Sequence, residues 1–252
     1  MCLKMSLDLD KIGESMLEDL KNPNGYWNTI INQMKLESAR LDKLEQICTE
    51  FKINPDDILN AYCYGSRVYG TAREDSDWDY ILVHKAAFIG PDKNAFKENA
   101  KSSEDRKIQI INFSRTGFKA ELEAFNMSCL ECLFLPEQFI LKARWPYSIN
   151  NFNKKEFTRN IITKASNSWH LATLAHKDER YVSSAKGFYH ALRIVNFAIQ
   201  IKEYGKIIDY TRATTFKKVV ADNILDMNFL RSYRDLLFDK LRFEQSDLVV
   251  NI

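Results

Sequence analysis

Two aspartates separated by one residue, Asp77 and Asp79, are the side chains of this sequence best placed to do chemistry. They open a β-forming run, 80–83, and residues two apart on a strand point to the same face. Two neighbouring carboxylates repel each other unless a cation lies between them. Mg²⁺ and Mn²⁺ accept such oxygen ligands, and Mg²⁺ readily shares phosphate oxygens. The pair therefore predicts a metal site, the alternative being an acidic edge that only keeps a strand soluble.

A glycine and a serine, Gly65 and Ser66, end an earlier apolar run, 58–64, and ten residues separate Ser66 from Asp77. Glycine lets a backbone approach a phosphate closely, and serine offers it a hydroxyl and an N–H. The two patterns together indicate a site for a metal-bound nucleotide.

A Gly-Ser followed by Asp-x-Asp at this spacing resembles the signature of the DNA polymerase β nucleotidyltransferase superfamily. The fuller string, 65–72 with 76–79, is similar to its small predicted nucleotidyltransferases of the phage-type and RlaP-like groups. The resemblance implies an enzyme that moves a nucleoside monophosphate from an NTP to a hydroxyl acceptor and releases pyrophosphate. It implies that Asp77 and Asp79 hold Mg²⁺ or Mn²⁺, while Gly65 and Ser66 bind phosphates with help from Arg67.

The acceptor is left open by the sequence. The RlaP-like group takes its name from an RNA repair pathway, so the resemblance favours an RNA end. A protein side chain or a small molecule remains an alternative, because fold-level analogy does not identify a substrate.

A third acidic residue usually lies on the neighbouring strand in this superfamily, where it completes a two-metal arrangement and can accept the proton of the attacking hydroxyl. The matching position here is Gln109, which can ligate a metal but is no base. Three alternatives follow. Glu131, Glu121 or Glu123 supplies the acid; two carboxylates and water suffice; or the chain is a catalytically impaired nucleotide- or RNA-binding module.

A helix expected over 183–204 places Lys186, His190 and Arg193 on one face, at i, i+4 and i+7. The run resembles the Lys…His-x-x-Arg helix of the RlaP-like families, which implies contact with a triphosphate. The alternative is a solvated face with a partly buried histidine. A basic cluster further on either guides an acidic polymer such as RNA or is ordinary surface: Lys202, Lys206, Arg212, Lys217 and Lys218.

The composition is that of an ordinary soluble protein, with 28% charged and 45% hydrophobic residues in 252. A net charge of +2 does not by itself indicate a nucleic-acid binder. No apolar run approaches the ~20 residues of a membrane span, and the first residues do not resemble a secretory signal. Five cysteines argue against a disulfide framework, and the pair Cys129 and Cys132 is expected to be buried thiols. We expect no membrane partner and a cytoplasmic (intracellular) location.

The predicted fold class is α+β, and the resemblance implies a polymerase-β-like core, a short mixed sheet with flanking helices, followed by a C-terminal helical bundle. Residues 1–57 are expected to form a helical lead-in packed on the core, 58–150 the catalytic core and 151–252 the helical domain. In the lead-in, a first helix over 7–20 is followed by a break at 22–25. Strands are expected at 58–64, 80–83 and 107–113, with a loop over 90–106. Helices are expected after Ser114 and near 154–175, 183–204, 214–222 and 227–243.

Overall fold

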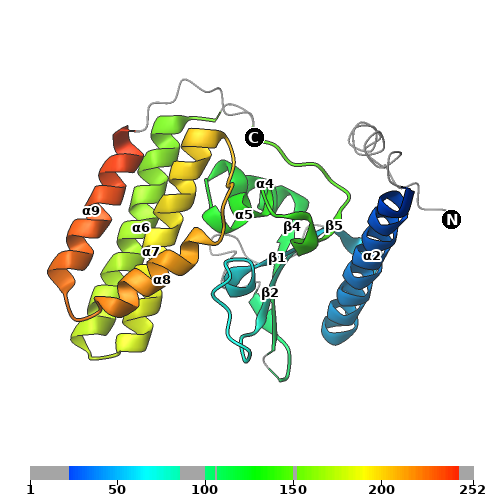
Figure 1. The fold of residues 1–252 in the computed structure, drawn as a ribbon, viewed down its shortest axis with the longest axis horizontal. Helices are drawn as coiled ribbons and strands as arrows, with labels where there is room; N and C mark the ends of the chain where they lie inside the picture. Colours follow the sequence, from blue (N-terminus) through cyan, green and yellow to red (C-terminus); the bar gives the residue numbers. More distant parts are fainter. Residues whose placement is uncertain (1–22, 86–99, 106, 150–151, 244–252) are drawn as a thin grey trace.

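The computed structural model of the chain describes residues 23–85, 100–105, 107–149 and 152–243. The helix predicted over 7–20 lies outside these residues. A β-sheet occupies the middle of the molecule, with α2 (Pro23–Phe51) on one side and the C-terminal helices on the other (Figure 1). The predicted α+β class is confirmed.

The sheet has five strands in the order β3-β4-β2-β1-β5. Its centre is formed by β1 (Ile58–Tyr64), β2 (Trp78–His84) and β4 (Ile108–Ser114). β2 and β4 are parallel and the other neighbouring strands are antiparallel, so the sheet is mixed, as expected. The three central strands lie where their β-branched and aromatic residues predicted them.

The two edge strands were not predicted. β3 (Ala100–Ser102) is exposed and lies inside the stretch 90–106, which the sequence indicated to be a loop. β5 (Ile140–Ala143) pairs with β1 at the other edge. Short edge strands take their hydrogen bonds from an existing neighbour and need no apolar alternation of their own, so the pattern does not reveal them.

Helices cover both faces of the sheet. On one face, Phe118 of α4 (Arg115–Glu123) lies 6.0 Å from Tyr62 and 5.8 Å from Phe113, between ring centroids. The short helix α5 (Met127–Cys132) follows on the same face against β1. On the opposite face, Lys43 of α2 lies over the rings of Trp78 and Tyr80. α2 thus contacts the sheet, and its helix already begins at Pro23, within the predicted break.

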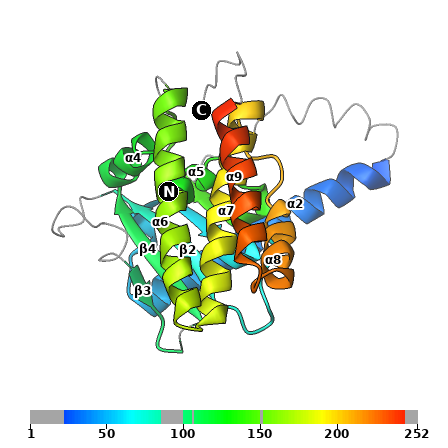
Figure 2. The ribbon, with the colours of Figure 1, turned by 90° about the vertical axis from the view of Figure 1, so that its left-hand side faces the viewer.

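In its described residues, the C-terminal part consists of four helices and their connections. It contains α6 (Lys154–Lys177), α7 (Tyr181–Tyr204), α8 (Arg212–Asp222) and α9 (Met227–Phe243), close to the predicted bounds. Figure 2 shows α6 and α7 side by side. They approach closely at Gly187, where an added Cβ would lie 2.8 Å from Cβ of Ala172. α7 ends at Gly205, which has the left-handed conformation common for a glycine just after a helix.

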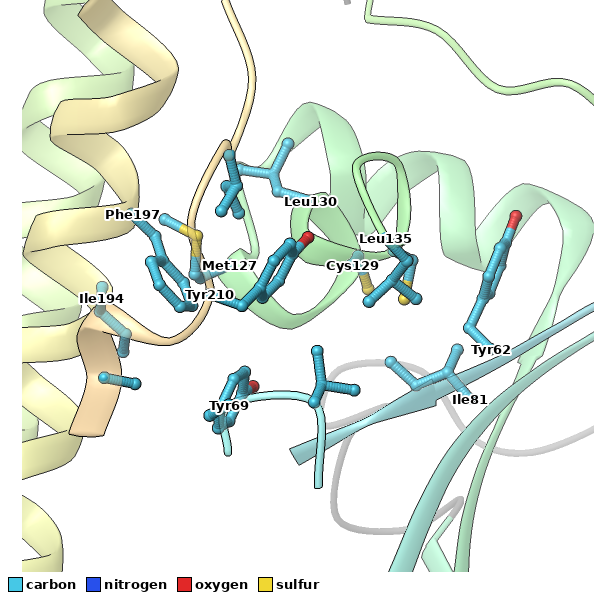
Figure 3. Close-up of a cluster of buried hydrophobic side chains, with 14 of the residues drawn as sticks. Tyr62, Tyr69, Ile81, Met127, Cys129, Leu130, Leu135, Ile194, Phe197 and Tyr210 are labelled. Atoms are coloured by element: carbon cyan, nitrogen blue, oxygen red, sulfur yellow. The ribbon is translucent and has the colours of Figure 1, made fainter. Parts of the chain in front are cut away.

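One continuous cluster of buried side chains extends from α2 through the sheet to α9. Figure 3 shows the part between the core and α7, where Phe197 and Tyr210 lie beside Met127 of α5. The described cysteines, which include Cys129 and Cys132, are buried free thiols. Within the described ranges, no helix is long and apolar enough to cross a membrane.

Candidate nucleotide site

A cleft of about 730 Å³ lies between the sheet and helices α6 and α7. This volume is within the range of small-molecule sites. Residues from both parts of the fold line it: Tyr64, Gly65, Ser66, Tyr69, Thr71, Asp77, Asp79, Gln109, Ser128, Ser168, Leu171, Ala172, Leu174, Ala175, Arg180, Ser183, Lys186, Gly187, Tyr189, His190 and Arg193. The cleft therefore joins the two sequence patterns that predicted phosphate binding.

The turn at Gly65 and Ser66 follows directly on β1, and Gly65 has a left-handed backbone with φ +81. A Cβ at this position would lie 2.3 Å from Oδ2 of Asp79, so both the conformation and the space require glycine. The backbone N–H groups of Thr71 and Ala72 both donate to the carbonyl of Ser66, which closes the loop on itself. The turn thus holds Ser66 beside the aspartate pair.

The aspartates meet Gln109 at one end of the cleft. Asp77 lies one residue before β2, and Asp79 in β2 is paired in register with Gln109 of the parallel strand β4. The Gln109 amide Nε2 donates to Oδ2 of Asp77 at 2.5 Å. Gln109 therefore lies on the neighbouring strand and faces the same side as the aspartates, as predicted.

The pair carries a charge that the protein only partly compensates. Burial, and then the neighbouring Asp77 carboxylate, raise the pKa of Asp79 to about 6, against the opposing influence of Lys186 and Arg67. Oxygen donors that repel each other at close range suit a hard divalent cation. Among the described residues, no three His, Cys, Asp or Glu side chains gather into a metal site, so a cation at this pair would need further ligands such as water or phosphate oxygens.

Arg67 does not line the cleft, contrary to the phosphate role that the resemblance implied. Its guanidinium donates to the backbone carbonyls of Ser76 and Asp77 and lies 4.2 Å from the centre of the Trp78 ring. These carbonyls belong to the segment that carries the first aspartate. Arg67 therefore fixes that segment in place and is not directed at a ligand.

Glu131 does not supply the missing acid. Its side chain is 1% exposed and forms an ion pair with Arg193, which is 3% exposed, with Nη1 and Oε1 2.5 Å apart. The Tyr69 hydroxyl donates to its other carboxylate oxygen, and the Tyr210 hydroxyl donates to its backbone carbonyl at 2.7 Å. A carboxylate held in this way binds α5 to α7, and it does not line the cleft.

The two helix acids do not replace it either. Glu121 accepts a hydrogen bond from Asn126 at 2.6 Å, and Glu123 pairs with Lys119 on the surface of α4 at 3.8 Å. Neither side chain lines the cleft. Within the described residues, the carboxylates at the site are therefore Asp77 and Asp79.

The predicted face of α7 does point to the cleft, but its three members have different roles. Lys186 is exposed and near enough to Asp79 to lower its pKa. His190 is kept neutral, because burial and the charges of Arg193 and Lys186 lower its pKa to about 3. Arg193 lines the cleft, yet its charge is already paired with Glu131. Lys186 is thus the α7 residue best placed to neutralise a phosphate.

Four members of the predicted basic cluster already form hydrogen bonds or ion pairs with other residues of the protein. Lys202 is buried and donates to the carbonyl of Leu241 at 2.6 Å, and Lys217 donates to that of Thr71 at 2.8 Å. The other two pair with acids of their own segments: Arg212 with Asp209, and Lys218 with Asp222. The geometry therefore gives no support to a basic track for RNA at this cluster.

Two of the cleft residues, Tyr189 and Thr71, lie outside the set predicted to bind the metal or the phosphates. Tyr189 of α7 and Thr71 of the Gly65 loop place their hydroxyl oxygens 3.5 Å apart, which connects the helical part to the phosphate loop. The signal for Tyr189 was its i+3 spacing from Lys186 on a helix already expected to face the site. Thr71 had no signal, because its position depends on how the loop folds back.

Comparison with known proteins adds no evidence on function. The sequence matches no protein-family model, and no curated protein matches it either. The arguments that follow therefore rest on the geometry of the cleft and on the motif itself.

Proposed function

We propose that the protein is a metal-dependent nucleotidyltransferase, which moves a nucleoside monophosphate from an NTP to a hydroxyl acceptor and releases pyrophosphate. One observation carries the proposal. Three segments line one cleft: the Gly65-Ser66 turn, the Asp77 and Asp79 pair, and, more than 100 residues later, the Lys186 face of α7. The turn can bind a phosphate, the two carboxylates can bind a cation, and the lysine can neutralise negative charge on the phosphates.

A cation fits the donor set, and Asp77 and Asp79 would hold it, with Gln109 within reach of the same position. When bound, Mg²⁺ or Mn²⁺ would offset phosphate charge and make the α-phosphorus easier to attack. The raised pKa of Asp79 supports this assignment, because a buried carboxylate beside another is stabilised by an added positive charge.

The chain's own groups would hold the triphosphate. Ser66 offers its hydroxyl and backbone N–H, and Lys186 offers an ammonium group from the opposite wall of the cleft. Such donors act by aligning the substrate and compensating charge that is already in place before the reaction. They are not consumed, and no covalent intermediate with the protein is required.

In the proposed reaction, the acceptor oxygen forms a bond to the α-phosphorus and the bond to the bridging β-phosphate oxygen breaks. Pyrophosphate leaves with that electron pair. The acceptor proton passes to water, because the described residues at the cleft include no third carboxylate to receive it. We therefore expect slower transfer than in enzymes with three acids.

The fold supports the finer assignment to a polymerase-β-like core, which we include in the proposal. A Gly-Ser turn ends β1, the antiparallel strand β2 carries the second aspartate, and the parallel strand β4 presents the third position. An RNA end remains the acceptor suggested by the resemblance, with a protein side chain or a small molecule as the alternatives.

A non-catalytic nucleotide- or RNA-binding module is a second candidate, and Gln109 is the observation in its favour. An amide that donates to Asp77 stands where the superfamily has an acid. A domain of this kind would retain the nucleotide-binding cleft but would not catalyse nucleotidyl transfer.

A transfer assay separates the two candidates. The protein is incubated with each α-labelled NTP, Mg²⁺ or Mn²⁺, and RNA, DNA or protein acceptors. We expect label on one acceptor class, its loss in Asp77→Ala, and its retention in Asp75→Ala, a matched change at an exposed carboxylate of the same loop. Tight NTP binding without label transfer to any acceptor would establish the binding module instead.

A further inference from the structure

His190, which lines the cleft, is hydrogen-bonded to a buried ion pair between Arg193 and Glu131, of which Glu131 does not line the cleft. On α7, the Arg193 guanidinium lies between the Glu131 carboxylate and the His190 ring. Nη1 contacts Oε1 of Glu131 at 2.5 Å, and Nη2 lies 3.1 Å from Nδ1 of His190. The ring of Tyr69 packs against the guanidinium at 4.0 Å and its hydroxyl donates to the same carboxylate. The arginine is therefore held on three sides.

The direction of the Arg193–His190 hydrogen bond follows from chemistry alone. A guanidinium has five N–H donors and no acceptor, and it stays protonated. Nδ1 of His190 must therefore carry the lone pair, and a neutral imidazole then carries its proton on Nε2. Nε2 forms no hydrogen bond within the described residues and is not enclosed, while the ring lines the cleft. The Nε2–H group of His190 is therefore available to a ligand in the cleft.

We propose that Glu131 and Arg193 are positioning residues that fix His190 in its neutral, Nε2-protonated form, so that it serves the cleft as an uncharged hydrogen-bond donor to a nucleotide phosphate. Arg193 acts on the ligand through His190 and not by direct contact. The identity of the ligand rests on the proposed function, whereas the tautomer does not depend on it.

The electrostatics agree with this arrangement. Burial, together with Arg193 and Lys186, lowers the pKa of His190, so the ring has no tendency to become a second cation beside Lys186. A neutral donor with a fixed orientation can bind a phosphate oxygen without adding charge to a cleft whose other end holds two carboxylates. The positive charge that faces the phosphates from this part of α7 then comes from Lys186.

The first test is spectroscopic and needs no ligand. Long-range ¹⁵N NMR of the histidine rings at pH 7 reports which ring nitrogen carries the proton, and the His190 signal is the one lost in His190→Gln. We expect a protonated Nε2 and an unprotonated Nδ1. A protonated Nδ1, or an imidazolium at this pH, would overturn the inference.

The second test uses two variants and a non-hydrolysable NTP analogue with Mg²⁺. His190→Gln keeps an N–H donor at the reach of Nε2, whereas His190→Asn has a shorter side chain that reaches only the level of Nδ1. We expect the Gln variant to bind within about threefold of wild type and the Asn variant to bind about tenfold more weakly, the loss of one hydrogen bond to a charged oxygen. Equal affinity of the two variants would contradict the donor role.

The outcomes separate this inference from the proposed function. If the wild-type protein shows the expected tautomer but binds no NTP, the proposed function is wrong, and the positioning of His190 by Glu131 and Arg193 is still supported. If the NTP binds but the proton is found on Nδ1, the proposed positioning of His190 is wrong, and the nucleotide site is still supported. If Arg193 contacts the phosphate directly, both histidine variants bind like wild type, and that result overturns the inference as well.

Discussion

At the scale of single residues, the site depends on side chains that have no room to change. Gly65 faces the Asp79 carboxylate so closely that the phosphate turn and the metal-binding strand form one unit. Gln109 donates a hydrogen bond to Asp77 and so connects β4 to the same group of side chains. Each of these contacts makes a separate prediction.

Gly65→Ala should destabilise the protein by more than about 2 kcal/mol and weaken NTP binding, because the methyl group meets Oδ2 of Asp79 on a backbone that already disfavours alanine. Gly205→Ala is the matched control. Its φ of +72 is similar but no atom lies within 4 Å of the added Cβ, so it should cost only about 1 kcal/mol. Denaturant titration measures both, and equal losses would mean that the contact with Asp79 is unimportant.

Gln109→Glu should place a third carboxylate beside the aspartates. The metal-free protein should then lose on the order of 1 kcal/mol of stability through like-charge repulsion, and Mn²⁺ should raise its melting temperature more than that of wild type. Gln138→Glu, an exposed position on the turn before β5, makes the same chemical change away from the cleft. An identical Mn²⁺ response in all three proteins would show that Gln109 is not at a metal site.

His190 predicts a pH dependence of stability. Its pKa in the folded protein, about 3, lies below the usual imidazole value of about 6.5, so below pH 6.5 the unfolded chain takes up a proton that the folded protein does not. Wild type should therefore lose roughly 1–2 kcal/mol relative to His190→Gln between pH 7 and pH 5. Chemical unfolding of both proteins at these pH values measures the difference, which should not change with pH if the ring titrates normally.

At the scale of the elements, one buried contact joins the sheet part to the helical part. Glu131 comes from α5, Arg193 from α7, and Tyr210 from the connection to α8. An ion pair so deeply buried is costly to break, because the remaining charge has no water to solvate it. The same contact explains why neither residue is available to a ligand.

Glu131→Gln should destabilise the protein by about 3–5 kcal/mol, since it leaves the Arg193 charge buried without its partner. Asp222→Asn removes a surface pair with Lys218 at a similar distance, 2.7 Å, and should cost less than about 0.5 kcal/mol. Thermal and chemical unfolding compare the two. A small loss for Glu131→Gln would show that the pair does not hold the helical part in place.

The sequence predicted elements better than it predicted contacts. The central strands and the four C-terminal helices followed from apolar periodicity. The phosphate turn and the aspartate pair followed from residue types at a fixed spacing. Arg67 and Glu131 could not be placed in this way, because a charged side chain takes the partners that the tertiary fold brings to it.

At the scale of the whole molecule, the cleft exists only because the helical part and the sheet share one core. The sheet supplies the carboxylates and the phosphate turn, and α6 and α7 supply the opposite wall. Neither part alone encloses the space. The central claim is therefore that these segments form a single metal–nucleotide site.

Calorimetric titration of a non-hydrolysable NTP analogue, with and without Mn²⁺, tests this claim most directly. Wild type should bind one equivalent with an affinity that depends on the metal, and the double variant Asp77→Asn, Asp79→Asn should lose that dependence. Asp75→Asn, at an exposed carboxylate of the same loop, should bind like wild type. Metal-dependent binding of equal strength in the double variant and in wild type would contradict the account.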